Sequence, residues 1–404
     1  MSFGIALSGL AAATTDLSVT ANNVANSATT GFKQSRSEFA EIFAVSPQGV
    51  SSKQVGQGVK VSSVSQQFTQ GNINTTNNSL DLAISGQGFF VVSDAGAKVY
   101  TRAGAFQVDN GGYVVNSQLQ RLQVYPPTST GDFNTSTTTD LRLVTSESAP
   151  HATSKVETVF NLPANAKPPV NATFDPADPT SYTKATSSTV YDSLGASHTA
   201  SMYFTNTGSN TWTSRLYVDG NAVGTPQALT YSSTGALTSP SPGTLTFPAY
   251  TPATGAAPMN LDYDIGMSTQ YGDSFSVTSV KDDGYATGRL IGIDVDSTGV
   301  VQARFTNGNS VSLGQVAITS FSNPQGLQPL DSTSWAETYT SGQPLNGQAG
   351  NSGFGLVQSG SLESSNVDIT AQLVNMITAQ RNFQANAQMI KTEDSVTQTI
   401  INLR

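Results

Sequence analysis

Large apolar residues recur with helical spacing at both ends of this 404-residue chain. Spacings that alternate between four and three residues are typical of the seam of an amphipathic helix. We expect such seams to be buried where helices pack against each other and against copies of themselves. The N-terminal apolar seam consists of Phe3, Leu7, Leu10, Leu17 and Val24, and the C-terminal apolar seam of Ile369, Leu373, Met376, Phe383, Ile390 and Ile400. Ser365, with Asp368 three residues later, predicts a capping box before the second helix.

Between the two helices, apolar and polar residues alternate, a pattern typical of β-strands. The alternation is clear from Leu80 to Ile84, from Phe89 to Val92 and in residues 291–295. Asn307-Gly308 separates two further alternating runs, and this dipeptide predicts a hairpin. The predicted fold class is therefore mainly β with terminal α-helices.

The middle of the chain predicts nested domains. Segments rich in Pro, Thr and Ser lie near residues 126–140, 163–180 and 239–258, and they indicate an inserted domain bounded by polar linkers. The elements then follow the order helix, β, inserted β, β, helix. In this order each domain other than the inserted one is built from one segment before and one segment after the inserted domain. The predicted parts are a helical domain of residues 1–30 with 364–404, a connecting segment of residues 31–74, a discontinuous β domain of residues 75–146 with 285–363, and an inserted outer β domain of residues 147–284.

Composition excludes several classes of function. The chain has 18 Lys and Arg against 27 Asp and Glu, a net charge of −9, and only 11% of its residues are charged. It therefore offers no cationic surface for nucleic acid or for anionic membranes. The absence of cysteine excludes disulfides and thiolate metal sites, and two histidines leave little scope for a serine triad or a multi-histidine metal site. We expect no metal and no cofactor.

The N-terminus lacks the basic segment and the continuous apolar segment of a secretory signal. No run of 18 or more apolar residues predicts a membrane span, so we expect no membrane insertion. However, a Cys-free composition rich in hydroxyl and amide side chains is common in bacterial proteins that work outside the cell. Either the chain is cytoplasmic with an unusual composition, or it is exported without a cleaved signal peptide.

Candidate chemical sites are weak. Asp294–Gly299 begins like a calcium loop, but Phe305 stands where a bidentate Glu belongs, which favours a turn between strands. Two carboxylate pairs could be the acid and base of a glycosidase, and three aromatic residues could line a carbohydrate face, although solvated strand ends and core positions are the simpler interpretations. These residues are Asp262 with Asp264, Asp282 with Asp283, and Trp212, Tyr217 and Tyr231. We predict no catalytic residue and no enzyme activity.

Four passages resemble the axial proteins of the bacterial flagellum, a family of rod, hook and hook-associated subunits. They are Ala21–Lys33, Leu80–Val91, Tyr100–Phe106 and Leu362–Asn386. The middle of the chain is not diagnostic. Residues of the family motif at matching positions are Asn22, Asn23, Ala25, Asn26, Gly31, Phe32, Asn366, Asp368, Gln380 and Arg381.

Within this family the chain is most similar to hook subunits, since it begins Met1-Ser-Phe, ends Ile400–Arg404 and contains an inserted domain. One departure is the loop from Ala44 to Gln57, which is longer than in the shortest hook subunits and similar to a segment of the distal rod. We expect this loop to stiffen a tube by bridging subunits. A distal rod subunit is the alternative within the family, and a secreted β-rich carbohydrate-binding protein or glycosidase is a remote alternative.

The resemblance implies a structural subunit that self-assembles into the flagellar hook, a hollow curved tube that transmits torque as a universal joint. It implies that the terminal helices pair as a coiled coil in the inner wall of that tube. The implied partners are copies of the chain, the distal rod, the hook cap, the hook–filament junction protein and the type III export apparatus. The implied location is outside the cell, in the hook and basal body.

Overall fold

The computed structural model describes residues 2–43, 56–128, 131–143 and 147–402. The chain divides into two compact units. Unit 1 comprises Met1–Val144, Gly292–Ala303 and Val311–Arg404, and unit 2 comprises Thr145–Ile291 and Arg304–Ser310. The four predicted domain ranges are finer than this division and stay a prediction. The predicted loop from Ala44 to Gln57 lies, apart from its last two residues, outside the described residues.

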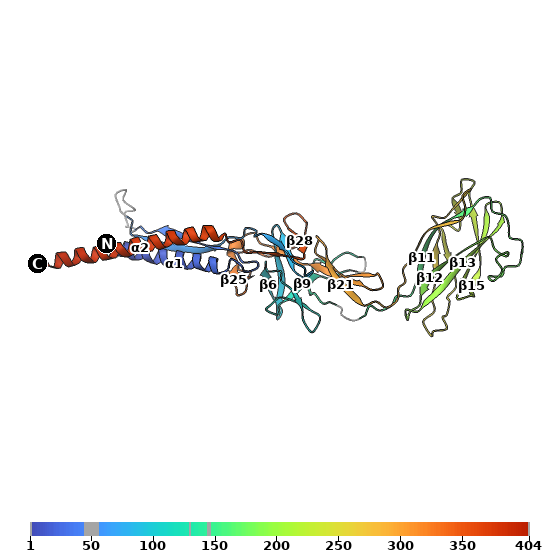
Figure 1. Cartoon of the computed structure of the whole chain (residues 1–404), viewed down its shortest axis with the longest axis horizontal. Helices are drawn as coiled ribbons and strands as arrows, with labels where there is room; N and C mark the ends of the chain where they lie inside the picture. The colour runs from blue at the N-terminus through green and yellow to red at the C-terminus, as the bar shows by residue number, and fades with distance from the viewer. Residues whose placement is uncertain (1, 44–55, 129–130, 144–146, 403–404) are drawn as a thin grey trace. The chain divides into compact units, whose positions relative to one another are not determined.

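Two long helices lie side by side in unit 1 (Figure 1). They are α1 (Ser2–Ala25) and α2 (Ile369–Asn402), and α1 also contacts a two-stranded antiparallel sheet of β1 (Ser35–Glu41) and β2 (Val59–Gln66). The predicted capping box is wrong. Asp368 itself is the cap, because its Oδ1 accepts hydrogen bonds from Thr370 N (2.8 Å) and Ala371 N (3.1 Å), whereas Ser365 precedes the helix by more than one residue.

A 13-stranded sheet forms most of the β structure of unit 1. Its main path runs β21-β22-β23-β9-β5-β6-β26-β25, and two-stranded sheets pair β28 (Leu356–Ser359) with β4 (Leu82–Ser85) and β29 (Ser361–Glu363) with β3 (Ile73–Thr75). A 3-10 helix, η1, spans Pro324–Gly326. The strands of the large sheet are β5 (Phe89–Asp94), β6 (Ala97–Thr101), β7 (Gln107–Val108), β8 (Val114–Val115), β9 (Arg121–Tyr125), β10 (Thr139–Asp140), β21 (Leu290–Val295), β22 (Val300–Phe305), β23 (Ser310–Val316), β24 (Ile318–Ser320), β25 (Gln328–Pro329), β26 (Ser334–Ala336) and β27 (Leu345–Gly347).

Both faces of the central strand β5 are buried. Phe90 and Val92 belong to one hydrophobic cluster, while Phe89 and Val91 belong to another. A strand covered on both sides is apolar at successive positions, which explains the run Phe-Phe-Val-Val. The predicted hairpin at Asn307-Gly308 is confirmed, since it joins β22 to β23.

Unit 2 is a sandwich of two five-stranded sheets. Alternate residues of β13 and β14 are buried and pack with residues of β11 in one hydrophobic core, as expected for facing sheets. The first sheet runs β12 (Lys184–Tyr191), β13 (Ser197–Gly208), β14 (Thr211–Val218), β15 (Asn221–Tyr231) and β16 (Leu237–Ser239); the second contains β17 (Thr244–Thr246), β18 (Asp262–Asp264), β11 (Lys155–Pro163), β19 (Thr269–Tyr271) and β20 (Ser276–Asp282). The predicted fold class, mainly β with terminal helices, is confirmed.

The possible carbohydrate face is wrong. Trp212 and Tyr231 lie in the core of unit 2, whereas Tyr217 lies on the opposite face of its sheet, with its ring 5.6 Å from that of Tyr203. The three side chains therefore share no surface. The simpler interpretation, that these aromatic residues are ordinary residues of strands, therefore agrees with the structure.

The carboxylates weighed as an acid and base make structural contacts instead. Asp264 pairs with Lys155 at 3.2 Å, and Asp283 accepts a hydrogen bond from the hydroxyl of Ser154 at 2.5 Å. In the calcium-like segment, Asp296 Oδ1 accepts hydrogen bonds from the backbone N of Thr298 and of Val300, both at 2.9 Å. These bonds close the turn between β21 and β22, as the sequence favoured.

One helix of unit 1 meets a simple criterion for a membrane span. Residues Phe3–Ala25 of α1 form a helix long and apolar enough, by length and composition alone, to cross a membrane. Gly, Ser and Thr interrupt this segment, so the sequence contains no continuous run of 18 apolar residues there. Packed helices of soluble proteins and N-terminal signal sequences meet the same criterion, so this property is weak evidence for a membrane span.

A buried histidine links three loops at one end of unit 2. His198 Nδ1 lies 2.6 Å from Asp219 Oδ2, and Nε2 lies 3.2 Å from Asp192 Oδ2, which also accepts a hydrogen bond from Thr254 Oγ1 at 2.7 Å. Burial alone would lower the pKa of His198, but hydrogen bonds and charge from Asp219 and Asp192 outweigh it and raise this pKa above its usual 6.5. The ring of Tyr250 packs edge-on against the imidazole.

We expect the stability of unit 2 to depend on pH through His198. Because the pKa is higher in the folded state, protonation stabilises unit 2 fully below about pH 6.5, and this stabilisation is lost as pH rises through the folded-state pKa. The temperature at the midpoint of thermal unfolding should therefore decrease as the pH is raised from 6 to 9. His198→Gln should unfold at a lower temperature at pH 6 and show a flatter pH profile. Parallel profiles for the two proteins would contradict this role.

Candidate assembly site

The two helices contact each other through small and polar side chains. On α1, Gly9 and Asn23 contact α2, and the buried residues of this helix are all small or polar: Ala6, Ala12, Ala13, Thr20 and Asn23. A Cβ atom at Gly9 would lie only 2.5 Å from Asn386 Oδ1, so the absence of a side chain permits this close approach. Gln372 and Ala379 are the buried positions of α2. The side chains that the helices bury completely within one chain are therefore small or polar.

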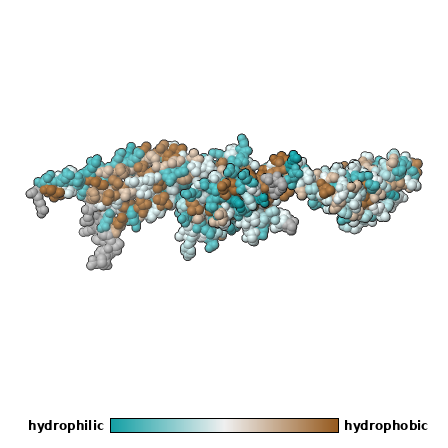
Figure 2. Space-filling model, turned by 90° about the horizontal axis from the view of Figure 1, so that it is seen from below, coloured by the Kyte–Doolittle hydropathy of each residue, from teal (hydrophilic) through white to brown (hydrophobic). Residues whose placement is uncertain are grey.

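The apolar seams lie largely outside this contact. On α1, Phe3 is 50% and Leu7 52% exposed, and the seam is displaced by one residue from the face that meets α2. Exposed seam residues of α2 are Ile369, Leu373, Phe383 and Ile400, while half-buried residues on the two helices are Leu10, Leu17, Val24, Met376 and Ile390. Further apolar side chains of α2, Val374, Ile377, Met389, Val396 and Ile401, are also exposed. Hydrophobic surface accordingly gathers over the helices (Figure 2).

The family-motif residue Asn23 ties α1 to both the hairpin and α2. Its Nδ2 donates to Ser35 O (2.7 Å), and Ser35 N donates to its Oδ1 (2.9 Å), so the side chain pairs with β1 like a piece of strand. Asn23 Nδ2 also donates to Gln372 Oε1 at 3.3 Å. Gln372 Nε2 in turn donates to Gln34 Oε1 at 3.2 Å. Because Asn23 and Gln372 are buried, these bonds fix where the helices meet.

Asn366 makes the corresponding contacts before α2. Its Oδ1 accepts a hydrogen bond from Gln34 N (2.8 Å), and its Nδ2 donates to Gln67 O (2.8 Å) and Thr69 Oγ1 (2.9 Å). One amide thus joins the segments after α1, after β2 and before α2. Together with Asp368 as the cap of α2, it positions the start of that helix.

The other motif residues have varied surroundings. Gly31 has φ +70°, and a Cβ atom there would lie 2.6 Å from Ala103 N, so this position requires glycine. Asn26 Nδ2 donates to Asn22 Oδ1 at 2.6 Å near the end of α1. Phe32 is half-buried, and Ala25, Gln380 and Arg381 are exposed. The motif therefore combines a buried junction with positions on the surface.

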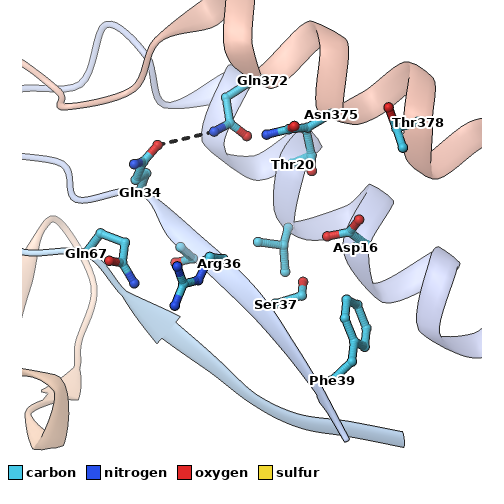
Figure 3. A pocket seen from close by; sticks show the side chains of 12 residues that line it. Asp16, Thr20, Gln34, Arg36, Ser37, Phe39, Gln67, Gln372, Asn375 and Thr378 are labelled. Atoms are coloured by element: carbon cyan, nitrogen blue, oxygen red, sulfur yellow. Dashed lines mark hydrogen bonds between the residues drawn. The ribbon is translucent and has the colours of Figure 1, made fainter. Parts of the chain in front are cut away.

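A polar pocket of about 420 Å³ lies between α1, α2 and β1 (Figure 3). Asp16 and Thr20 line it from α1, and Asn375 and Thr378 from α2. Its lining holds no histidine and no group of carboxylates. Among the described residues, no group of three or more His, Cys, Asp or Glu side chains could hold a metal ion.

A buried ionic cluster anchors the helical ends to the β structure of unit 1. Glu363, at the end of β29, lies between two cations: its Oε1 is 2.6 Å from Lys33 Nζ, and its Oε2 is 3.1 Å from Arg102 Nη1. The side chains of Lys33 and Glu363 are fully buried. Lys33 follows α1 and Glu363 precedes α2, so the cluster joins both helical connections to one point beside the sheet.

Backbone groups complete the cluster. Lys33 Nζ donates to Thr69 O (2.8 Å), Arg102 Nη2 donates to Gly86 O (2.8 Å), and Gly71 N donates to Glu363 Oε1 (2.9 Å). Burial lowers the pKa of Lys33, and the nearby Arg102 adds to this effect, while Glu363 opposes it.

The sequence analysis did not single out the ionic cluster. Glu363 lies 330 residues after Lys33 and 261 residues after Arg102 in the chain, so no local spacing connects the three residues. Each one nevertheless lies inside a family-like passage of a chain that is poor in charge. The presence of charged residues within these passages was the sequence signal that could have indicated the cluster.

Glu363→Gln should strongly destabilise unit 1. The substitution leaves Lys33 and Arg102 buried without a negative partner, and breaking a buried pair in this way costs about 3–5 kcal/mol. Urea unfolding should show a much lower midpoint than in the original chain. The matched control is Glu38→Gln, because Glu38 pairs with Arg36 on the surface, and its midpoint should barely change. Equal midpoints for the two variants would show that the buried cluster does not stabilise the fold.

Four family models match successive parts of the chain. They are the flagella basal body rod protein (residues 3–33), the flagellar hook protein FlgE/F/G D1 domain (residues 83–167), the flagellar basal body protein FlaE D2 domain (residues 161–285) and the flagellar basal body rod FlgEFG protein C-terminal (residues 358–403). Together they span most of the sequence, including both helices.

Curated relatives match over the full length. The flagellar hook protein FlgE of Salmonella typhimurium is 36% identical over 412 residues, and that of Escherichia coli is 37% identical over 418 residues, each covering 100% of both chains. The FlgE of Borreliella burgdorferi is 31% identical and covers 98% of both chains. The crystal structure of Helicobacter pylori FlgE2 shares the fold, with a TM-score of 0.55 at 14% identity over 72% of this chain and 100% of that chain. The chain belongs to the flagellar hook protein family.

Proposed function

We propose that the apolar seams are the surfaces through which copies of this hook subunit polymerise into the wall of a tube. The observation that carries the proposal is the exposure of large apolar side chains on both helices, although the contact between the helices uses small ones. Burial of apolar surface contributes roughly 25 cal/mol per Å², so neighbouring copies that cover these faces gain substantial stability. Exposed apolar areas of this kind mark interaction sites.

The geometry of assembly follows from the different faces. In a helical polymer each copy meets the next through unlike surfaces, so a chain needs at least two contact faces. The N-terminal apolar seam and the exposed side of α2 provide two such faces, and the buried contact between α1 and α2 sets the angle between them. The helices would then form the inner wall, where cohesion is greatest.

The properties of unit 2 support a separate role for it, which is to set the curvature of the tube. Unit 2 has its own hydrophobic core, and the outward positions of β12 and β13 are mostly Ser and Thr. Hydroxyl groups exchange hydrogen bonds with water at small net cost, so contacts made by such a surface can slide. We assign cohesion to the helices and curvature to unit 2.

The proposal also includes partners other than copies of the chain, namely those of a hook subunit. A subunit of this kind meets copies of itself, the distal rod at one end and the hook cap or the hook–filament junction protein at the other, after passage through the type III export apparatus. A chain without cysteine forms no disulfide that would hinder passage in an unfolded state. The role of the loop from Ala44 to Gln57 in stiffness stays a prediction.

Charges on the apolar seams should prevent polymerisation without unfolding the subunit. Leu7→Glu and Leu373→Glu each place a carboxylate on a surface that is exposed in the free chain, so the unfolding midpoint should change little. In a polymer the same carboxylate would be buried without a partner. The critical concentration for tubes, measured by sedimentation and electron microscopy, should rise about tenfold or more.

Ala385→Glu is the matched control. It adds the same charge at an exposed position of α2 that lies, at about 100° per residue, on the side of the helix away from Leu373 and Phe383, and Ala and Glu are both good helix formers. This variant should form tubes at nearly the original concentration. Tubes of Leu7→Glu and Leu373→Glu at that concentration would refute the assignment of the apolar seams.

Removal of most of unit 2 should leave polymerisation intact but change the curvature of the tubes. His151 N donates to Tyr285 O at 3.0 Å, so the two segments that enter and leave the deleted part are adjacent. Residues 152–284 can therefore be replaced by a short glycine linker. Electron micrographs should show tubes of altered curvature. If the shortened chain remains monomeric at all concentrations, unit 2 takes part in cohesion instead.

A further inference from the structure

A fully exposed tyrosine stands on a rigid loop of unit 1. Tyr339 is 101% exposed, and it lies in the loop Glu337–Pro344. Thr338 O accepts a hydrogen bond from Ser341 Oγ (2.8 Å), and Thr338 N donates to Ser341 Oγ (2.9 Å). A rigid aromatic side chain loses little conformational entropy on binding, which is why tyrosine is enriched at the centres of interfaces.

The loop is also anchored from outside. Asn323 Nδ2 donates to Thr340 O at 3.0 Å, and Asn323 N donates to Ser341 O at 3.3 Å. Gly326 approaches so closely that a Cβ atom there would lie 2.6 Å from Ser341 N. The segment around η1 thus holds the loop, and Tyr339 projects from a fixed base.

A pocket of about 340 Å³ lies at the other end of the same hairpin. β25 pairs with β26, and the tip that joins them, Leu330–Thr333, contacts the segment after α1, where Thr333 Oγ1 donates to Thr30 O at 3.4 Å. The pocket lies between this tip and the end of α1. Its lining includes Asn22, Asn26, Phe32, Leu330 and Asp331.

The size and lining of this pocket suit a phenol. A cavity of about 150 Å³ holds a benzene ring, so the pocket has room for the larger side chain of tyrosine. Leu330, which is 43% exposed, and Phe32 supply apolar contacts for a ring. The carboxylate of Asp331 and the amides of Asn22 and Asn26 supply partners for a hydroxyl group.

The hairpin separates the tyrosine from the pocket of its own chain. Five residues lie between the last tip residue, Thr333, and Tyr339, and eight lie between the first, Leu330, and Tyr339. An extended strand rises about 3.3 Å per residue, so the separation is on the order of 20 Å. One chain therefore carries a protruding group and a matching pocket at opposite ends of one rigid element. Unlike surfaces of this kind generate head-to-tail polymers rather than closed dimers.

We infer that Tyr339 of one copy enters the pocket between the β25–β26 tip and α1 of the next copy. This inference rests on the proposed function, in which copies form a helical polymer, and it names a contact outside the apolar seams. The contact fixes the register between consecutive copies, because a single side chain must meet a single pocket.

Cysteine cross-linking tests the contact directly, since the chain has no cysteine of its own. Tyr339→Cys is combined with Leu330→Cys in the full chain, tubes are formed, and a short bismaleimide that spans the length of the replaced side chain is added. A denaturing gel should show a ladder of dimers, trimers and higher species. The matched control combines Tyr339→Cys with Leu356→Cys, a similarly exposed residue of unit 1, and should give no ladder.

Electron microscopy of the same samples separates the two proposals. Tubes without a ladder, or equal ladders in both double variants, would overturn the tyrosine contact and leave the seam proposal standing. Absence of tubes from the original chain would instead count against the seam proposal.

Substitutions of Tyr339 alone give a second measurement that does not depend on cross-linking. Tyr339→Ala should raise the critical concentration about tenfold or more, and Tyr339→Phe, which keeps the ring, should raise it less. The unfolding midpoint of the monomer should not change, because this side chain is fully exposed. Polymerisation of Tyr339→Ala at the original concentration would overturn the inference.

Discussion

The structure of unit 1 depends on the pairing of Glu363 with Lys33 and Arg102. The two helical segments are remote in sequence, and the side chains that α2 buries completely are the polar Gln372 and the small Ala379. The ionic cluster supplies a fixed point at which both connections meet β structure. An exchange of Glu363 for an apolar residue would leave two buried cations without a negative partner, so this position tolerates little variation. The hydrogen bonds of the Asn23 and Asn366 side chains extend this fixed point to the end of α1 and the start of α2.

The division of labour between helix faces follows from this anchor. Small residues such as Gly9 and Ala13 allow the helices to approach within one chain, and the large residues remain outside. A subunit that buried its large residues internally would be more stable alone but would have less to gain from assembly. Here the ionic cluster and the amide network stabilise the isolated junction, so the apolar faces are free for contacts between copies. In the proposed assembly α1 is covered on several sides by neighbours, and such a helix requires few charges, in agreement with its apolar composition.

The sequence predicted features that depend on local pattern. The two helices, the β character of the middle and the hairpin at Asn307-Gly308 are encoded within short windows. The face that each helix turns toward the other could not be predicted in this way. Hydropathy identifies the large apolar residues, but it is insensitive to a contact made by a glycine and an amide, such as Gly9 with Asn386. The ionic cluster and the pocket beside Leu330 depend on residues that only tertiary structure brings together. Asp368 replaced Ser365 as the cap since a carboxylate at the end of an extended segment can accept two backbone hydrogen bonds at once.

The main part of unit 2, Thr145–Ile291, begins and ends in two adjacent segments, paired at Ser148 with Gly288 and at His151 with Tyr285. This arrangement determines how mechanical load travels through a single subunit. A force applied between the helices and the large sheet passes through the ionic cluster and the short sheets beside it. It does not need to cross the inserted unit, whose two ends are held at one place. Unit 2 is therefore protected from tension along the chain, and its sandwich can remain folded while the rest of the subunit is under strain.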